Sequence, residues 1–135
     1  MKLAFADSYF YLALLNPRDA GHEIASTVVA EFAGRIVTTQ WILVEVGDAM
    51  SDPVHRPLFE RLMVTLSSNS DVEVVPADES WFQRGFELYQ RRPDKKWSLT
   101  DCISFCVMEH LSIRDAFTGD HHFLQAGFTP LLPTK

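Results

Sequence analysis

Short runs of apolar and β-branched residues alternate along this chain with longer stretches that carry helical periodicity. Strands separated by helices imply a parallel sheet with helices on both of its faces, so the alternation predicts an α/β fold. Most connections between neighbouring strands are then right-handed crossovers. The 135 residues fit a single domain, 1–135, and 47 % of them are hydrophobic, which is enough for a full apolar core.

The pattern predicts five strands and seven helices. The strands are expected at 2–6, 35–38, 72–75, 115–118 and 129–132. The helices are expected at 8–15, 19–32, 39–50, 57–66, 79–91, 98–111 and 121–126, with a polar turn at 67–70. The helix at 98–111 is almost wholly apolar, which predicts a central position in the fold.

Bulk properties exclude several classes of protein. No apolar run approaches the ~20 residues of a membrane-spanning helix. Asp7 interrupts the first apolar stretch before a secretory signal could form, so we expect a cytoplasmic protein. The net charge of −6 argues against a protein that coats nucleic acid. It does not exclude a nuclease whose carboxylates are neutralised by bound cations.

The chain has two cysteines, Cys102 and Cys106, and His110 continues their spacing of four. These three residues are a conceivable site for a soft metal. Leu99 and Ile103 share the same helix face, however, and this favours packing in the core as the role of the cysteines.

Two acidic residues follow predicted strands, where ligands bind in open parallel sheets. Asp7 comes directly after the first strand, and Asp120 comes two residues after the fourth. Asp101 lies in the first turn of the apolar helix, and Glu45 lies in the middle of the helix after the second strand. These positions are so far apart in sequence that only the fold can bring the four carboxylates together.

Each acid also has a purely structural interpretation. Asp7 and Asp120 precede helices and can be N-caps, and Asp101 stands three residues after Ser98, as in a capping box. Glu45 lies in a helix that is apolar nearly all round, where a carboxylate is costly unless it is paired or bound to a metal. The alternative for Glu45 is an ion pair with a distant arginine.

Convergence of the four carboxylates would raise their pKa values in the empty protein, because like charges repel. A bound Mg²⁺ or Mn²⁺ removes that cost, since both ions prefer oxygen ligands. Such a cation can activate a water molecule and polarise a phosphate, which is the chemistry of phosphodiester hydrolysis.

Four segments then match a known family. They are AFADS at 4–8, TTQWILVEV at 38–46, SLTDCISF at 98–105 and FTGDHHF at 117–123. In order and spacing the chain resembles PIN domains, most closely the toxin nucleases of the VapC type. The resemblance implies a three-layer sandwich with a central parallel sheet, and an Mg²⁺- or Mn²⁺-dependent endoribonuclease.

The resemblance also assigns roles to individual residues. It implies that the metal ligands and catalytic acids are Asp7, Glu45, Asp101 and Asp120. Polar supports around them would be Thr100, Ser104 and Thr118, although small hydroxyls at helix starts are commonly only caps. His122 stands where many relatives carry a second acid, so a second metal ion would be held less firmly. Catalysis with one tightly bound ion is therefore as consistent with the resemblance as catalysis with two.

A basic run precedes the helix that carries Asp101. Arg91, Arg92, Lys95 and Lys96 could bind RNA phosphates beside the pocket, and Trp97 could stack on a base. The alternative is a solvated loop with Trp97 packed inward.

The resemblance implies three partners: an RNA substrate, an antitoxin protein and a second copy of the chain. The apolar residues of 57–63 are candidates for part of a homodimer surface, although core packing is the other interpretation.

Other enzymes and regulators that gather acids at a sheet edge fit less well. A phosphorelay receiver needs a phosphoacceptor Asp after the third strand, where Pro76 stands. A phosphatase with a nucleophilic Asp needs a second Asp at position 9, which is Tyr. The remaining alternative is a catalytically silent PIN fold that serves as an RNA- or protein-binding scaffold.

Overall fold

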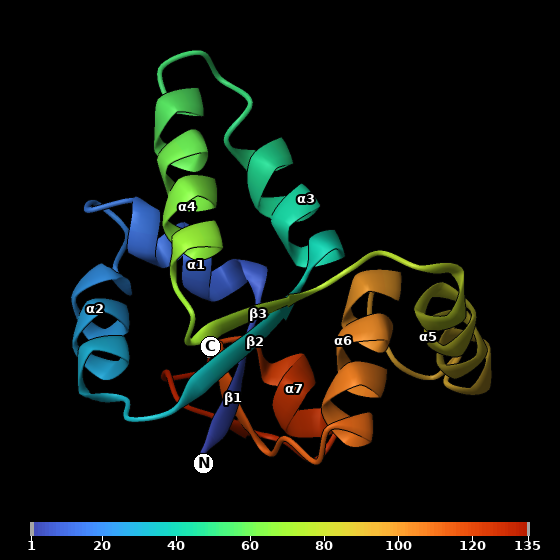
Figure 1. The fold of residues 1–135 in the computed structure, drawn as a ribbon. Helices are drawn as coiled ribbons and strands as arrows, with labels where there is room; N and C mark the ends of the chain where they lie inside the picture. Colours follow the sequence, from blue (N-terminus) through green and yellow to red (C-terminus); the bar gives the residue numbers. More distant parts are fainter. Residues whose placement is uncertain (1, 135) are drawn as a thin grey trace.

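A five-stranded parallel sheet forms the centre of the protein (Figure 1). The computed structural model describes residues 2–134. The strands are β1 (Leu3–Ala6), β2 (Arg35–Thr39), β3 (Val72–Val75), β4 (Asp115–Phe117) and β5 (Thr129–Pro130). They lie in the order β3-β2-β1-β4-β5, and every neighbouring pair is parallel. The predicted α/β class is confirmed.

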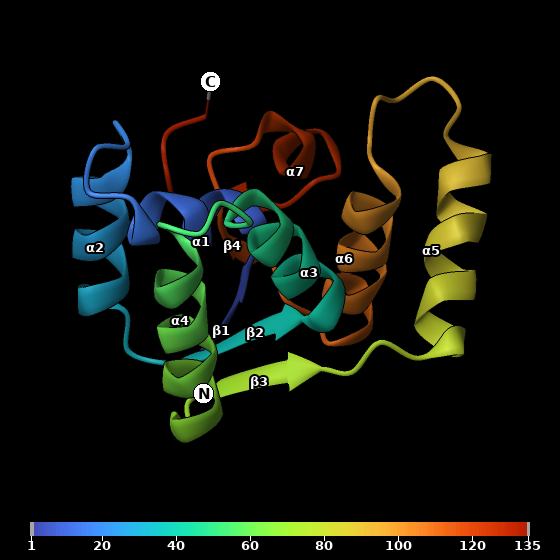
Figure 2. The same ribbon diagram turned by 90° about the horizontal axis from the view of Figure 1, so that it is seen from above.

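Within residues 2–134, seven helices connect these strands. They are α1 (Ser8–Leu15), α2 (His22–Glu31), α3 (Gln40–Ala49), α4 (Arg56–Ser68), α5 (Glu79–Arg91), α6 (Leu99–His110) and α7 (His121–Gln125). The chain runs from β1 to β3 in one direction along the sheet and then reverses to reach β4 and β5. Right-handed crossovers therefore place α1–α4 on one face and α5–α7 on the other (Figure 2). None of the helices within residues 2–134 is long and apolar enough to cross a membrane.

Two buried phenylalanines of the central strands mark the two faces of the sheet. Phe5 of β1 packs against Phe123 of α7, with ring centroids 6.3 Å apart. Phe117 of β4 packs in the opposite layer against Phe10 and Phe32, with centroid distances of 5.0 and 5.1 Å. Each face of the sheet thus has its own apolar layer, as a sheet covered on both sides requires.

Strand β5 ends at Pro130 rather than at position 132, and two predicted helix boundaries were wrong for local reasons. Helix α2 begins at His22 rather than at position 19, because the Asp19 carboxylate accepts a hydrogen bond from the Gly21 N–H at 2.8 Å and forms a turn. Helix α4 continues through Ser67 and Ser68, which were expected in the turn. Both hydroxyls donate to the carbonyl of Val64 within the same helix.

Helix α6 is central, as its composition predicted, and it packs along α5. Cys102 is buried in the core, and the Cys106 thiol donates to the carbonyl of Arg84. The His110 ring meets the Trp81 ring edge-on at 5.4 Å. The cysteines therefore serve packing, and the conceivable soft-metal trio is not formed.

The order of the strands creates a crevice between β1 and β4. The chain direction reverses at this point, so α1 and α7 leave the carboxyl ends of adjacent strands toward opposite faces. Such a switch point is where ligands bind in open α/β sheets. Asp7 follows β1 and Asp120 follows β4, so the fold brings the two acids to one crevice.

Candidate active site

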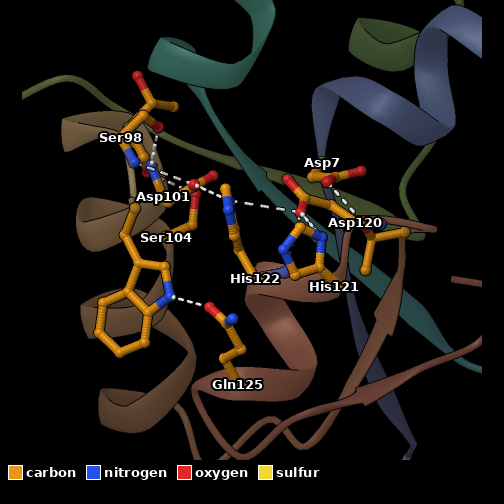
Figure 3. A network of polar contacts seen from close by, with 11 residues as sticks. Asp7, Ser98, Asp101, Ser104, Asp120, His121, His122 and Gln125 are labelled. Carbon is orange, nitrogen blue, oxygen red and sulfur yellow. Dashed lines mark hydrogen bonds and ion pairs between the residues drawn. The ribbon is translucent and has the colours of Figure 1, made fainter. Parts of the chain in front are cut away.

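A pocket of about 380 Å³ includes all four predicted acids in its lining. The residues around it are Asp7, Ser8, Tyr9, Leu12, Ile42, Glu45, Lys96, Ser98, Asp101, Asp120 and His122. Part of the polar network that joins them is drawn in Figure 3. Residues separated by more than one hundred positions in sequence thus meet at one site.

Asp7 is the most buried of the four acids, with 4 % of its surface exposed. It caps α1, and its Oδ1 accepts a hydrogen bond from the Phe10 N–H at 3.1 Å. Its Oδ2 accepts the Thr118 hydroxyl at 2.6 Å, and the same hydroxyl oxygen accepts the Asp120 N–H at 3.0 Å. Thr118 therefore holds Asp7 in a fixed position relative to Asp120.

Burial raises the pKa of Asp7 to about 7. The hydrogen bonds from Thr118 and from the Phe10 N–H act in the opposite direction, because both stabilise the charged form. The charges of Asp120 and Asp101 add to the increase. Near neutral pH, this carboxyl group is thus partly protonated when no cation is bound.

Asp101 belongs to a capping box at the start of α6. Its Oδ2 accepts the Ser98 N–H at 3.1 Å, and the Ser98 hydroxyl accepts the Asp101 N–H at 2.9 Å. Burial raises the pKa of Asp101, and the charge of Asp120 acts in the same sense, whereas contacts with Ser98 and His122 lower it. The capping interpretation is correct, and the same carboxylate also faces the pocket.

Asp120 caps the short helix α7 and lies beside two histidines. Its Oδ1 accepts the His122 N–H at 2.9 Å. The His122 Nδ1 lies 3.1 Å from Asp101 Oδ2 and 3.4 Å from Asp120 Oδ1, so this ring stands between the two acids (Figure 3). The preceding Gly119 permits close packing on this side, because a Cβ there would lie 2.6 Å from the Tyr9 ring.

Glu45 is half-buried on α3. Burial raises its pKa, the hydroxyls of Ser8 and Thr100 lower it, and the charge of Asp101 raises it further. No Lys or Arg within residues 2–134 forms an ion pair with Glu45, so the arginine alternative fails. One side of this apolar helix faces solvent, because Val44 is 59 % exposed.

The donor set of the pocket fits a divalent cation. None of the four acids is ion-paired with a Lys or Arg in the described part of the chain. Ligand atoms of Asp120, His121 and His122 lie within 4.8 Å of one another and form a candidate metal cluster. Asp7, Glu45 and Asp101 line the same pocket as Asp120 and His122, and a cation bound there would offset the charge of these carboxylates.

The three predicted supports have different contacts. Thr118 binds Asp7 directly, and Thr100 lies beside Glu45. The Ser104 hydroxyl donates to the Thr100 carbonyl at 3.0 Å, within its own helix.

Sequence reasoning did not single out two polar residues beside the acids, Ser8 and His121. Ser8 follows Asp7 at the first position of α1, so its closeness to the pocket could have been inferred.

The basic run divides into residues beside the pocket and residues away from it. Lys96 contributes to the lining of the acidic pocket. Arg92 instead binds Asp94 through two hydrogen bonds of 3.0 and 3.1 Å, and Lys95 lies 4.0 Å from the same carboxylate. Arg91 ends α5 at an exposed position.

Trp97 packs inward, which overturns the suggestion that it stacks on a base. It is 7 % exposed, and its Nε1 donates to the Gln125 side chain at 3.1 Å. Its ring also meets Phe105 edge-on at a centroid distance of 5.1 Å.

Comparison with known proteins gives two related matches and one negative result. The chain is 30 % identical over 132 residues to the "23S rRNA-specific endonuclease VapC20" of Mycobacterium tuberculosis, in strains CDC 1551 / Oshkosh and ATCC 25618 / H37Rv. The alignment covers 97 % of this chain and 99 % of each relative. No protein-family model matches the chain.

The solved structure of M. tuberculosis VapC20, described as a sarcin-ricin loop cleaving toxin, is similar in fold. The TM-score is 0.86 at 24 % sequence identity, and the alignment covers 95 % of this chain and 97 % of that one. The three-layer arrangement is therefore that of the VapC20 fold.

The raised pKa of Asp7 predicts how the metal-free protein responds to pH. In the unfolded chain Asp7 ionises near 3.8, but in the fold it ionises near 7. The folded state therefore binds more protons at Asp7 between these values, so the contribution of Asp7 to stability is greatest below pH 3.8 and is lost as pH rises toward 7. The upper limit of the loss from Asp7 is about 4 kcal/mol.

Urea unfolding in chelator at pH 5 to 8 would measure this loss. The free energy of unfolding should fall less steeply with pH in Asp7→Asn than in the wild type, by about 1 kcal/mol per pH unit. Asp78 caps α5 at an exposed position, so Asp78→Asn is a matched control and should keep the wild-type slope. A wild-type slope in Asp7→Asn would contradict the assignment.

Proposed function

The chain belongs to the VapC-type PIN-domain nucleases, and from this premise we propose that its acidic pocket hydrolyses RNA phosphodiester bonds with a bound Mg²⁺ or Mn²⁺. Members of this family are endoribonuclease toxins, and this chain is one of them. The observation that carries the proposal for the pocket is the convergence of Asp7, Glu45, Asp101 and Asp120 without any Lys or Arg partner among residues 2–134.

In this proposal the carboxylates of Asp7, Glu45 and Asp101 hold the cation, and Asp120 contacts it directly or through water. When bound, a divalent cation supplies a more acidic water as nucleophile and offsets the charge of the phosphate. Thr118 holds Asp7 and Asp120 in fixed positions relative to each other, because its hydroxyl group is hydrogen-bonded to both residues. Thr100 orients Glu45, and Ser104 supports the first turns of α6 through the Thr100 carbonyl.

Lys96 is the basic residue that we assign to the RNA backbone at the pocket. It is exposed and contributes to the pocket lining, so its ammonium group is free to approach a phosphate. Arg92 and Lys95 are already paired with Asp94, and Arg91 lies at the end of α5. We therefore expect these three residues to contribute to general attraction of RNA rather than to positioning.

We propose a ribosomal RNA of the large subunit as the substrate. The support is the similarity to a 23S rRNA-specific endonuclease, which extends over 97 % of the chain. We also propose that the protein acts in the cytoplasm, where ribosomes are, and that an antitoxin protein restrains it there.

A second copy of the chain is the other proposed partner. A cavity of about 730 Å³ lies between α3 and α4, and its apolar lining includes Leu43, Val44, Phe59 and Met63. Phe59 and Met63 fall in the predicted interface segment, whereas Leu62 of the same segment is buried in the core. A homodimer that covers this cavity would remove exposed apolar surface from water.

Cleavage of RNA tests the activity directly. With Mg²⁺ or Mn²⁺, the wild-type protein should cut large-subunit RNA internally and leave 5′-phosphate and 3′-hydroxyl ends, because water rather than the 2′-hydroxyl is the nucleophile. Asp101→Asn should lower the rate at least ~10²-fold, whereas Glu109→Gln, an exposed change on the same helix, should not. Sequencing of new 5′ ends in ribosomal RNA is the measurement. Cleavage in chelator, or cyclic phosphate ends, would exclude the mechanism.

Lys96 and Lys95 form a matched pair of adjacent lysines. Lys96→Ala should lower kcat/KM about tenfold and reduce the slope of log kcat/KM against log salt by about 0.7 to 0.9, the contribution of one phosphate contact. Lys95→Ala should change both quantities less, because Lys95 is paired with Asp94. Equal effects of the two substitutions would argue against a specific role for Lys96.

The homodimer predicts a molecular mass of about twice 15.4 kDa in light scattering at micromolar concentration. Met63→Glu places a charge in the cavity between α3 and α4 and should yield a monomer. Val64→Glu is the control, because Val64 is an exposed residue of α4 outside that lining. A monomeric wild type would overturn the assignment of this surface.

A further inference from the structure

The ring of His122 stands between two carboxylates of the pocket, those of Asp101 and Asp120. Its Nδ1 lies 3.1 Å from Asp101 Oδ2 and 3.4 Å from Asp120 Oδ1. Only 20 % of the side chain is exposed, so the ring is largely enclosed by the site. Its backbone N–H donates a hydrogen bond to Asp120 Oδ1 at 2.9 Å, which fixes the backbone position from which the ring extends.

These distances match those between ligands of one metal ion. Two ligand atoms that each bind one ion at about 2.1 Å lie about 3.0 Å apart when adjacent and about 4.2 Å apart when opposite. Both distances from the His122 Nδ1 fall in this interval. The nitrogen can therefore share a cation with either flanking carboxylate without a large rearrangement.

We propose that His122 is a direct nitrogen ligand of the catalytic cation, so that the pocket selects a first-row transition ion such as Mn²⁺ over Mg²⁺. Mn²⁺ also prefers oxygen ligands, but as a transition ion it accepts an imidazole nitrogen more readily than Mg²⁺, which keeps much of its water. A site built only from Asp7, Glu45, Asp101 and Asp120 would lack this discrimination. The inference rests on the proposed function, because it names a further ligand at the same site.

His121 is the natural comparison, since it is the adjacent residue and also an imidazole. Its Nδ1 lies 3.8 Å from Asp120 Oδ1, and 53 % of its side chain is exposed. Within residues 2–134, His121 forms no ion pair or hydrogen bond with Asp101, whereas His122 contacts both acids. The shorter distances and the lower exposure assign the nitrogen ligand to His122 rather than to His121, the other imidazole of the candidate metal cluster, and His121→Gln tests that choice.

The decisive measurement is the electron spin echo of Mn²⁺ bound to the protein. A nitrogen bonded to the ion modulates the echo, and the pattern changes when histidine ¹⁴N is replaced by ¹⁵N. The wild-type protein should show this nitrogen signal without any substitution. His122→Gln should lose the signal, and His121→Gln should keep it.

Calorimetric titration provides the second measurement. The wild-type protein should bind Mn²⁺ more tightly than Mg²⁺, and His122→Gln should reduce the ratio of the two affinities at least ~10-fold. Asp101→Asn should weaken the binding of both ions.

Each contrary result has a distinct meaning. Mn²⁺ binding without a nitrogen signal overturns this inference and leaves the proposed function intact. A signal that vanishes in His121→Gln instead overturns the assignment to His122. A rise in affinity for both ions in His122→Gln would show that the ring competes with the cation, which also overturns the inference. Absence of any divalent binding by the folded wild type overturns both the inference and the proposed function.

Discussion

One hydroxyl group joins the two strands on which the site depends. Thr118 Oγ1 donates to Asp7 at the end of β1 and accepts from the Asp120 N–H at the start of α7. The two strands are hydrogen-bonded neighbours only because the chain reverses direction between them. A parallel sheet wound in one direction would have carried these residues apart. The reversal brings the acids near each other, and Thr118 fixes their relative position because it is itself fully buried.

The capping and active-site interpretations of the acids are compatible. Asp7, Asp101 and Asp120 each accept a backbone N–H at a helix start, so these local contacts restrict their rotamers. A carboxylate has more acceptor positions than one cap requires, so it can also face a ligand. Capping thus contributes to preorganisation, since the free energy that fixes each helix start also positions a carboxylate.

Local patterns predicted the elements well and the contacts between elements poorly. Helices α1 and α5 and strand β3 have the expected bounds, because Pro17, Pro76 and Asp78 are strong local signals at or near their ends. The start of α2 was misjudged because the side chain of Asp19 satisfies a turn, which helical periodicity does not register.

Asp7 and Asp120 could be identified from strand ends, Glu45 from its apolar helix, and all four acids from the resemblance to PIN domains. The sequence left inward packing of Trp97 as one of two alternatives, and it did not predict the place of His122 between Asp101 and Asp120. Trp97 depends on contacts with Gln125 and Phe105, and His122 depends on how α7 sits against α6. Such contacts are set by packing between elements that are distant in sequence.

Burial of the Asp7 carboxylate has a free-energy cost, and this cost argues against a catalytically silent scaffold. A carboxyl group whose pKa rises from 3.8 to about 7 destabilises the metal-free fold near neutral pH, by an amount on the order of 4 kcal/mol when fully ionised. A protein that only bound RNA or another protein through its outer surface would gain stability from Asn or an apolar residue at this position. A bound cation offsets the cost by stabilising the charged form, and stability then increases with occupancy of the site. The buried acid is thus a liability for a scaffold and a requirement for a metal-dependent nuclease.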